Sequence, residues 1–144
     1  MKKFLKFSLI LALLITMGGY APAVFATATV TPATGGSAIS ADTTGGSYAA
    51  LAGPIILEGA TADIGTGTII LNAPSGFNFN TVASSVTATR TDVAGTRCNP
   101  SRRLLINAGA AQIVTPTATT ITINITRITS SGCRNIITWT GIQV

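Results

Sequence analysis

The sequence predicts an all-β protein, an antiparallel β-sandwich of seven to nine strands that follows an N-terminal signal-peptide helix. Three observations carry this prediction. Apolar and polar residues alternate over several short runs, glycine and proline separate these runs, and no helical period continues beyond residue 26. Short alternating strands spaced about ten residues apart are typical of sandwiches. A small barrel is the alternative architecture.

The first 26 residues have the pattern of a secretory signal peptide. Three lysines lie among the first six residues, an apolar run covers Phe7–Met17, and the small-residue segment APAVFA follows. We expect cleavage after Ala26, with Ala23 as a second option. The apolar run is shorter than the ~20 residues that span a bilayer. The chain therefore divides into a signal peptide, 1–26, and one exported domain, 27–144, with membrane contact only through the export signal.

The clearest strand of the exported domain is Thr119–Ile128. Ile121, Ile123 and Ile125 fall on one face of this run, and threonines and Asn124 fall on the other. A period of two with β-branched residues on one side predicts a half-buried strand. We expect the isoleucines to face the core.

The stretch Gly65–Asn80 reads as strand, turn and strand. Pro74, Ser75 and Gly76 supply turn chemistry between the two alternating runs. The second run, Phe77–Asn80, places both phenylalanines on one face. Because this stretch holds two of the four aromatic residues of the exported domain, we expect the core to assemble around it, with Phe77, Phe79 and Trp139 all in the core.

The other expected strands are shorter. Val86–Thr91 places Val86 and Ala88 toward the core, and Asn135–Val144 is the last strand, in which Gly141 forms a bulge that keeps Ile142 on the core side. We expect Ala111–Thr115 to form a hairpin with the strand before it. The remaining candidates, in chain order, are Thr27–Pro32, Ala38–Ser40, Ile55–Leu57 and Arg103–Asn107. The pattern of Tyr48–Leu51 is ambiguous.

Charge and cysteine content limit the class of partner. Residues 27–144 hold six arginines, no lysine and four acidic residues, so their net charge of +2 is too small to indicate nucleic acid. Two cysteines, Cys98 and Cys133, predict one disulfide in an exported chain. Two free thiols are the alternative.

The residues that catalysis needs are scarce. The chain has no histidine to act as a base, and Glu58 is its single glutamate. Glu58 and Asp63 flank one loop and have the oxygen chemistry of a calcium site, but two carboxylates are few, and we interpret them as solvated loop charges. We predict no catalytic residue, no cofactor and no metal site.

Arginines near the cysteines are the best candidates for ligand contact. Five of the six arginines of residues 27–144 would gather at one end of the sandwich if the disulfide forms: Arg97, Arg102, Arg103, Arg127 and Arg134. We predict ligand contact by all of these except Arg127. Guanidinium groups pair with anionic glycans or phosphate-rich envelope polymers; the alternative is that they only add solubility. Tyr48, in a glycine-flanked stretch, is the one aromatic residue left for a sugar contact.

Three segments carry a resemblance to a known family. Ala62–Phe79, Ile137–Val144 and Ala28–Gly36 resemble parts of the immunoglobulin-like sandwich repeats of large bacterial secreted and surface proteins. The two cysteines, and Ala62 where glycine is expected, depart from that pattern. The resemblance implies an immunoglobulin-like fold and a role as a spacer or adhesive unit.

These observations lead to one expected function and two alternatives. We expect a non-catalytic structural or adhesive module whose partners are neighbouring domains, other surface proteins or glycans. The alternatives are a carbohydrate-binding module and a filament subunit joined by strand exchange. Because the sequence stops inside an apolar strand at Val144, we also expect the natural chain to continue.

Overall fold

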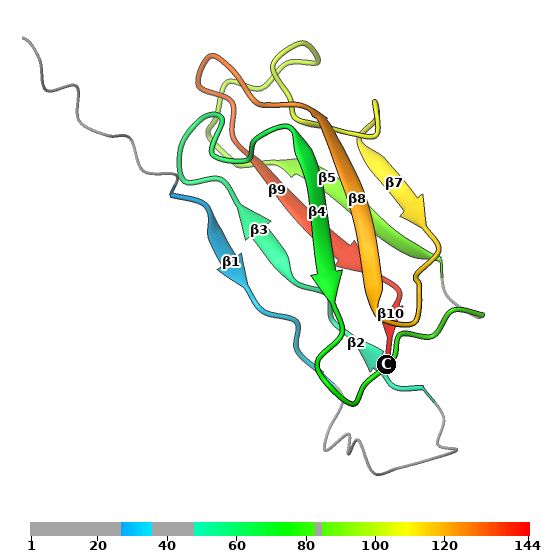
Figure 1. Cartoon of the computed structure of the whole chain (residues 1–144). Helices are drawn as coiled ribbons and strands as arrows, with labels where there is room; N and C mark the ends of the chain where they lie inside the picture. Colours follow the sequence, from blue (N-terminus) through cyan, green and yellow to red (C-terminus); the bar gives the residue numbers. More distant parts are fainter. Residues whose placement is uncertain (1–26, 36–47, 83–84) are drawn as a thin grey trace, which may run out of the picture.

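The computed structural model describes residues 27–35, 48–82 and 85–144, and these residues form ten β-strands (Figure 1). The predicted signal peptide and the predicted strand at 38–40 lie outside the described residues. The strands are β1 (Thr29–Thr31), β2 (Ala50–Leu51), β3 (Ile55–Leu57), β4 (Gly67–Asn72), β5 (Val86–Asp92), β6 (Leu105–Ile106), β7 (Ala111–Val114), β8 (Thr120–Arg127), β9 (Asn135–Thr140) and β10 (Ile142–Gln143). The excess over the expected seven to nine comes from strands of only two residues.

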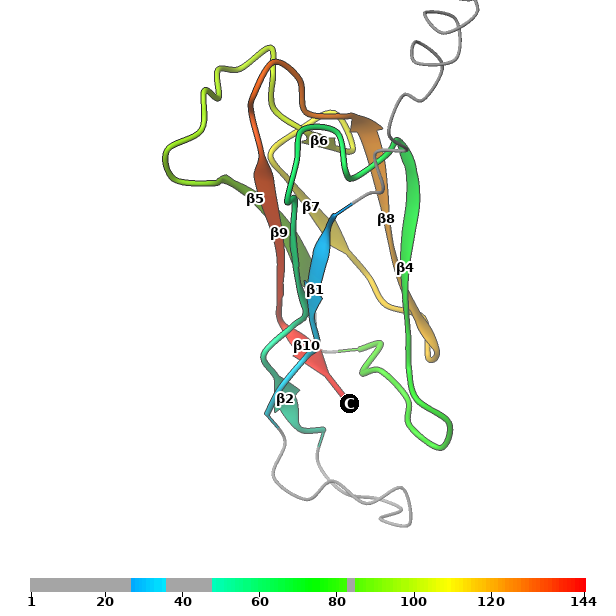
Figure 2. The ribbon, with the colours of Figure 1, turned by 90° about the vertical axis from the view of Figure 1, so that its left-hand side faces the viewer.

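Two sheets lie face to face, so the predicted sandwich is confirmed (Figures 1 and 2). One sheet has five strands in the order β1-β3-β9-β5-β7, and the other has three in the order β4-β8-β6. A separate pair, β2 and β10, lies at the end of the molecule where the chain stops. Every strand pair is antiparallel.

The core lies between the inner faces of the two sheets. The isoleucines of β8, Ile121, Ile123 and Ile125, are each 1% exposed, as the alternating pattern predicts. They pack in one cluster with residues of β5 and β9, among them Ile137 and Trp139. Period two is therefore a reliable guide for the long central strands.

The stretch 65–80 does not form the centre of this core. Its first run is β4, as predicted, but β4 pairs only with β8 among the described residues, and Ile69 and Leu71 are only partly buried. The predicted strand at Phe77–Asn80 is wrong. Phe79 N–H bonds Ala118 and Asn80 N–H bonds Gln143, so this segment crosses the end of the sandwich without following one neighbour. Phe79 is nevertheless buried, as predicted.

The predicted hairpin of β7 with the preceding strand is also wrong. β7 pairs with β5, from Val86↔Val114 to Thr89↔Ala111. Asn107 and Ala108 both have positive φ, and they make a tight turn closed by hydrogen bonds between Ile106 and Gly109. This turn ends β6 after two residues and sends the chain to the edge of the five-stranded sheet.

Gly141 separates β9 from β10. It has φ +80, and a Cβ atom there would lie 2.8 Å from the carbonyl oxygen of Ser85. The chain therefore turns out of the five-stranded sheet and pairs with β2, instead of continuing past the predicted bulge. Ile142 still reaches the core side, with 3% exposure.

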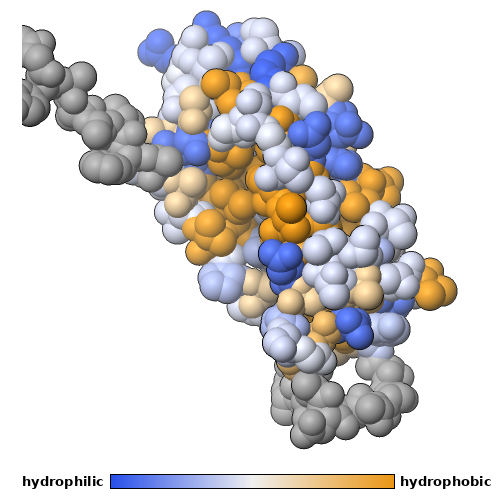
Figure 3. All heavy atoms as spheres, in the orientation of Figure 1, coloured by the Kyte–Doolittle hydropathy of each residue, from blue (hydrophilic) through white to orange (hydrophobic). Residues whose placement is uncertain are grey.

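Apolar side chains reach the surface near the β1 and β4 edges. Val30, Ile55 and Ile70 are exposed by 60%, 39% and 52%, and Figure 3 shows apolar surface on this face of the molecule. The described residues include no helix with the length and apolar character needed to cross a membrane.

Candidate functional site

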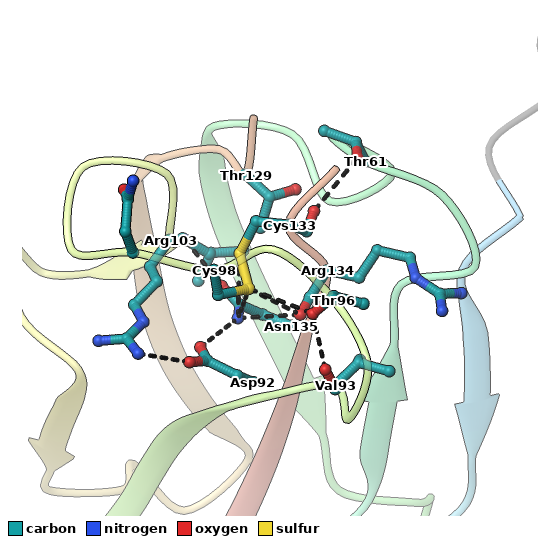
Figure 4. Close-up of a disulfide and its surroundings, with 12 residues drawn as sticks. Thr61, Asp92, Val93, Thr96, Cys98, Arg103, Thr129, Cys133, Arg134 and Asn135 are labelled. Carbon is teal, nitrogen blue, oxygen red and sulfur yellow. Dashed lines mark hydrogen bonds and ion pairs between the residues drawn. A yellow bond between two sulfur atoms is a disulfide. The ribbon is translucent and has the colours of Figure 1, made fainter. Parts of the chain in front are cut away.

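The predicted disulfide between Cys98 and Cys133 is present and ties together two loops at one end of the sandwich (Figure 4). Cys98 lies in the loop after β5, and Cys133 lies in the turn before β9. Arg97 N–H donates to Gly132, and Ser130 N–H donates to Arg102, so backbone bonds also join the two loops. A disulfide is compatible with the oxidising compartment expected for an exported protein.

Asn135, the first residue of β9, is fully buried beside the disulfide. Its side-chain oxygen accepts a hydrogen bond from Leu104 N–H at 2.8 Å, and its amide nitrogen donates to an Asp92 carboxylate oxygen at 2.9 Å. Asp92 in turn pairs with Arg103 at 2.5 Å. The amide thus links the two ends of the loop 93–103 to β9.

Glu58, directly after β3, is also fully buried, so the interpretation as a solvated charge is wrong for this residue. One carboxylate oxygen accepts hydrogen bonds from the Thr129 hydroxyl at 2.9 Å and from Ile64 N–H at 3.3 Å. The other oxygen accepts from Asn135 N–H at 2.8 Å. Burial raises the pKa of Glu58, and these hydrogen bonds partly oppose the rise.

Asp63 organises the other end of the same loop. Its carboxylate accepts hydrogen bonds from Ala60 N–H at 2.6 Å and from the Thr27 hydroxyl at 2.8 Å. The bond from Ala60 is the main reason that the pKa of Asp63 is lowered. The carboxylates of Glu58 and Asp63 therefore both hold this loop in place by accepting hydrogen bonds from the chain's own donors.

The four arginines predicted to contact a ligand lie on the loops at the disulfide end, but they differ in their bonding partners and in their exposure. Arg103 is held by Asp92, and Arg134 donates to the Gly59 carbonyl at 2.9 Å. Arg102 is half-buried and Arg97 is exposed. Tyr48 is 50% exposed and precedes Ala49, which pairs with Val144 at the opposite end. The arginines and Tyr48 therefore do not form one site.

Arg90 is a further candidate, which was not among the residues predicted from the sequence. It follows Val86 and Ala88 in the inward-facing row of β5, and it lies opposite the fully buried Ile137 of β9. Its Nε and Nη1 atoms are buried and have no hydrogen-bond partner among the described residues. The sequence did contain a signal for Arg90. It lies two residues after Ala88 and four after Val86, and residues at this spacing point to the same face of a strand.

Asp92, Cys98 and Cys133 bring three atoms of metal-ligand type within 4.8 Å of one another. Both sulfur atoms are bonded in the disulfide, so neither is available as a thiolate. In the oxidised protein this group is a structural cluster.

Comparison of the chain with models of protein families, with characterised proteins and with solved structures found no match.

Proposed function

We propose that this chain is a non-catalytic structural or adhesive module of an exported bacterial surface protein, built to carry tension along its long axis. The observation that supports this proposal is the position of the first and last residues that the structure describes, Thr27 and Val144. Thr27 bonds to Asp63 at the disulfide end, and Val144 pairs with Ala49 at the opposite end, marked C in Figure 1.

The terminal strands suit such a load. β1 and β9 both pair with β3, each antiparallel to it, so β1 and β9 run parallel to one another. A force that pulls Thr27 away from Val144 acts along these strands. Antiparallel hydrogen bonds lie perpendicular to the strands, so the pull loads the bonds of each pair together, in shear, and not one after another.

Both points where force enters are attached to the body. The Thr27 hydroxyl donates to Asp63 at 2.8 Å, which fixes the start of β1 to the loop that Glu58 anchors. At the other end, Val144 N–H donates to Ala49 at 3.0 Å and Ala49 N–H donates to Val144 at 2.7 Å. Tension therefore reaches the sheet without first extending a loose end.

The disulfide adds a second mechanical feature. It closes a segment with a sequence separation of 35 residues, which a pulling force does not extend while the bond is intact. Reduction would release about 120 Å of additional chain at roughly 3.5 Å per residue. An oxidised module is therefore shorter when unfolded and loses less of its structure to force.

Single-molecule pulling tests this proposal. The exported domain, attached at residues 27 and 144, is expected to unfold at a high force in one step. Attachment at residues 82 and 144 is the control, because Asn80 bonds to Gln143 and both points therefore lie at one end. In this second geometry the force separates the strands one hydrogen bond after another, so the domain should unfold at a clearly lower force. Equal forces in the two geometries would reject the tension-bearing role.

The edge of β4 favours a second candidate function, a subunit that pairs with a second copy through exchanged or added strands. β4 is six residues long, pairs only with β8 among the described residues and exposes Ile70. Such an edge can accept another strand. Sedimentation of the exported domain over a range of concentrations should then show polymers that Ile70→Lys prevents and that Val82→Lys, in a loop, leaves unchanged. A concentration-independent monomer would exclude this candidate.

A further inference from the structure

We propose that Arg90, Arg103 and Arg127 form a binding site for a tetrahedral oxyanion, the phosphate or sulfate group of an anionic polymer or of a free ion. This site is independent of the tension-bearing role. It also differs from the arginine set expected from the sequence, because it centres on Arg90.

The three arginines converge from both sheets and from the loop between them. Arg90 extends the inward-facing row of β5, and Arg127 extends the row of Ile121, Ile123 and Ile125 on β8. Arg127 Nε donates to the Arg103 carbonyl at 2.9 Å, and its Nη2 atom donates to the Pro100 carbonyl. These bonds tie the Arg127 side chain to the backbone segment that carries Arg103.

Unpartnered donors are concentrated in this cluster. Among the described residues, the buried side-chain nitrogen atoms without a hydrogen-bond partner are Arg90 Nε and Nη1, Arg103 Nε and the indole nitrogen of Trp139. Most of them therefore belong to two neighbouring guanidinium groups. Buried donors of charged groups are costly when unpaired. A bound ligand that supplies acceptors to both guanidinium groups would remove this cost.

Charge points to an anion as the source of those acceptors. The charged groups that act on Arg90 are Asp92, Arg103 and Arg127, so one carboxylate faces three guanidinium groups. Burial lowers the pKa of Arg90; Asp92 opposes this effect, and the two other arginines add to it. Asp92 is already bonded to Arg103 and Asn135. The cluster therefore has an excess of two positive charges.

The donor chemistry selects the class of anion. A guanidinium group offers N–H donors in a planar fork that matches two oxygens of a phosphate or sulfate group. Two surplus charges match a dianion better than a carboxylate or chloride ion. We therefore expect phosphate and sulfate to bind more tightly than acetate or chloride at the same ionic strength.

Thermal unfolding of the exported domain in phosphate, sulfate, acetate and chloride, at one ionic strength, tests the site. Phosphate or sulfate at 100-fold above its Kd should raise Tm by on the order of 10 °C, and acetate should not. Arg90→Gln should abolish the phosphate response, and Arg97→Gln, an exposed arginine at the same end, should keep it. Equal Tm in all four salts, or a normal response of Arg90→Gln, would overturn the proposal.

Two further measurements cover the remaining cases. If Arg90→Gln does not fold, NMR of the unmodified domain should show the Arg90 and Arg103 Nε–H signals moving with a saturable dependence on phosphate; signals that do not move would overturn the site. Titration with polyphosphate and with inorganic phosphate distinguishes the source. If polyphosphate binds more tightly per phosphate group than inorganic phosphate does, the ligand is a polymer. Equal affinity per phosphate group identifies a free ion.

Discussion

The backbone N–H of Asn135 donates a hydrogen bond of 2.8 Å to the fully buried carboxylate of Glu58, across 77 residues of sequence. This bond joins the end of β3 to the start of β9 at the disulfide end of the sandwich. The Thr129 hydroxyl and Ile64 N–H complete the set of donors to the same carboxylate. One side chain therefore holds together three segments that are far apart in the sequence.

Replacing Glu58 by glutamine should lower the free energy of unfolding by about 1–3 kcal/mol at neutral pH. Glutamine keeps the shape and one acceptor, but its NH₂ group would face either Ile64 N–H or Asn135 N–H, and that donor would lose its partner. Urea denaturation measures the change. Asn78→Ala, on an exposed loop residue, is the control and should have little effect. A Glu58→Gln protein as stable as the unmodified domain would contradict the proposed role of the carboxylate.

Stability should depend on pH through the same residue. The folded-state pKa of Glu58 is raised above 4.5, so the folded protein binds the proton more tightly than the unfolded chain does. This contribution to stability is therefore fully present below pH 4.5 and is lost as the pH rises through the folded-state pKa. Denaturation at a series of pH values should show this decline in the unmodified domain.

The decline should be absent in Glu58→Gln, which has no group to titrate there. Asp63 provides the opposite sign in the same experiment. Its folded-state pKa is lowered from 3.8, so its contribution is present above that pH and is lost as the pH falls through the folded-state pKa. If the variant retains the decline above pH 4.5, another group must be responsible.

Removal of the disulfide, as Cys98→Ala with Cys133→Ala, should reduce the free energy of unfolding by about 3–4 kcal/mol in the chain-entropy model. The closed segment is long, with a sequence separation of 35 residues, so the crosslink strongly restricts the unfolded chain. Guanidinium denaturation of the oxidised, reduced and doubly substituted proteins gives the comparison. Reduced and substituted proteins should agree with each other, and equal stability of all three would refute this account.

Two glycines provide a matched steric test. A Cβ atom at Gly53 would lie 2.2 Å from the carbonyl oxygen of Trp139, whereas one at Gly65 would meet nothing within 4 Å. Gly53→Ala should therefore destabilise the domain by at least about 1–3 kcal/mol, because the backbone of β9 must move. Gly65→Ala should be neutral or stabilise by up to about 1 kcal/mol. The ranking of the two Tm values checks the prediction, and a reversed ranking would contradict the packing described at Trp139.

The alternation of apolar and polar residues predicted burial correctly where a strand has one buried face and one solvent-exposed face. The isoleucines of β8 and the pair Val86 and Ala88 of β5 are buried as their alternation predicts. The disulfide was also predictable, because two cysteines allow a single pairing. Phe77–Asn80 shows the limit of this reasoning. Its alternation is that of a strand, but no neighbouring strand in the described part of the chain offers it a continuous ladder of partners.

The candidate site was predictable only in part, because contacts between residues far apart in the sequence decide which charged side chains are buried and which lie together. Sequence proximity to the cysteines led to Arg97, Arg102, Arg103 and Arg134, which lie on the loops at the disulfide end. It did not lead to Arg90, which strand pairing places opposite Ile137. Nor did it indicate that Glu58 is buried, because the donors that satisfy its carboxylate come from residues 64, 129 and 135.

By itself, the sequence determined the class of fold, the inward faces of the long strands and the single disulfide, because alternation and cysteine pairing depend on near neighbours and on composition. Only the tertiary structure decided which strands pair, that Thr27 and Val144 lie at opposite ends of the sandwich, and which charged side chains are buried. Those properties depend on contacts between residues far apart in the chain, and the energy of a charge is set by what surrounds it after folding.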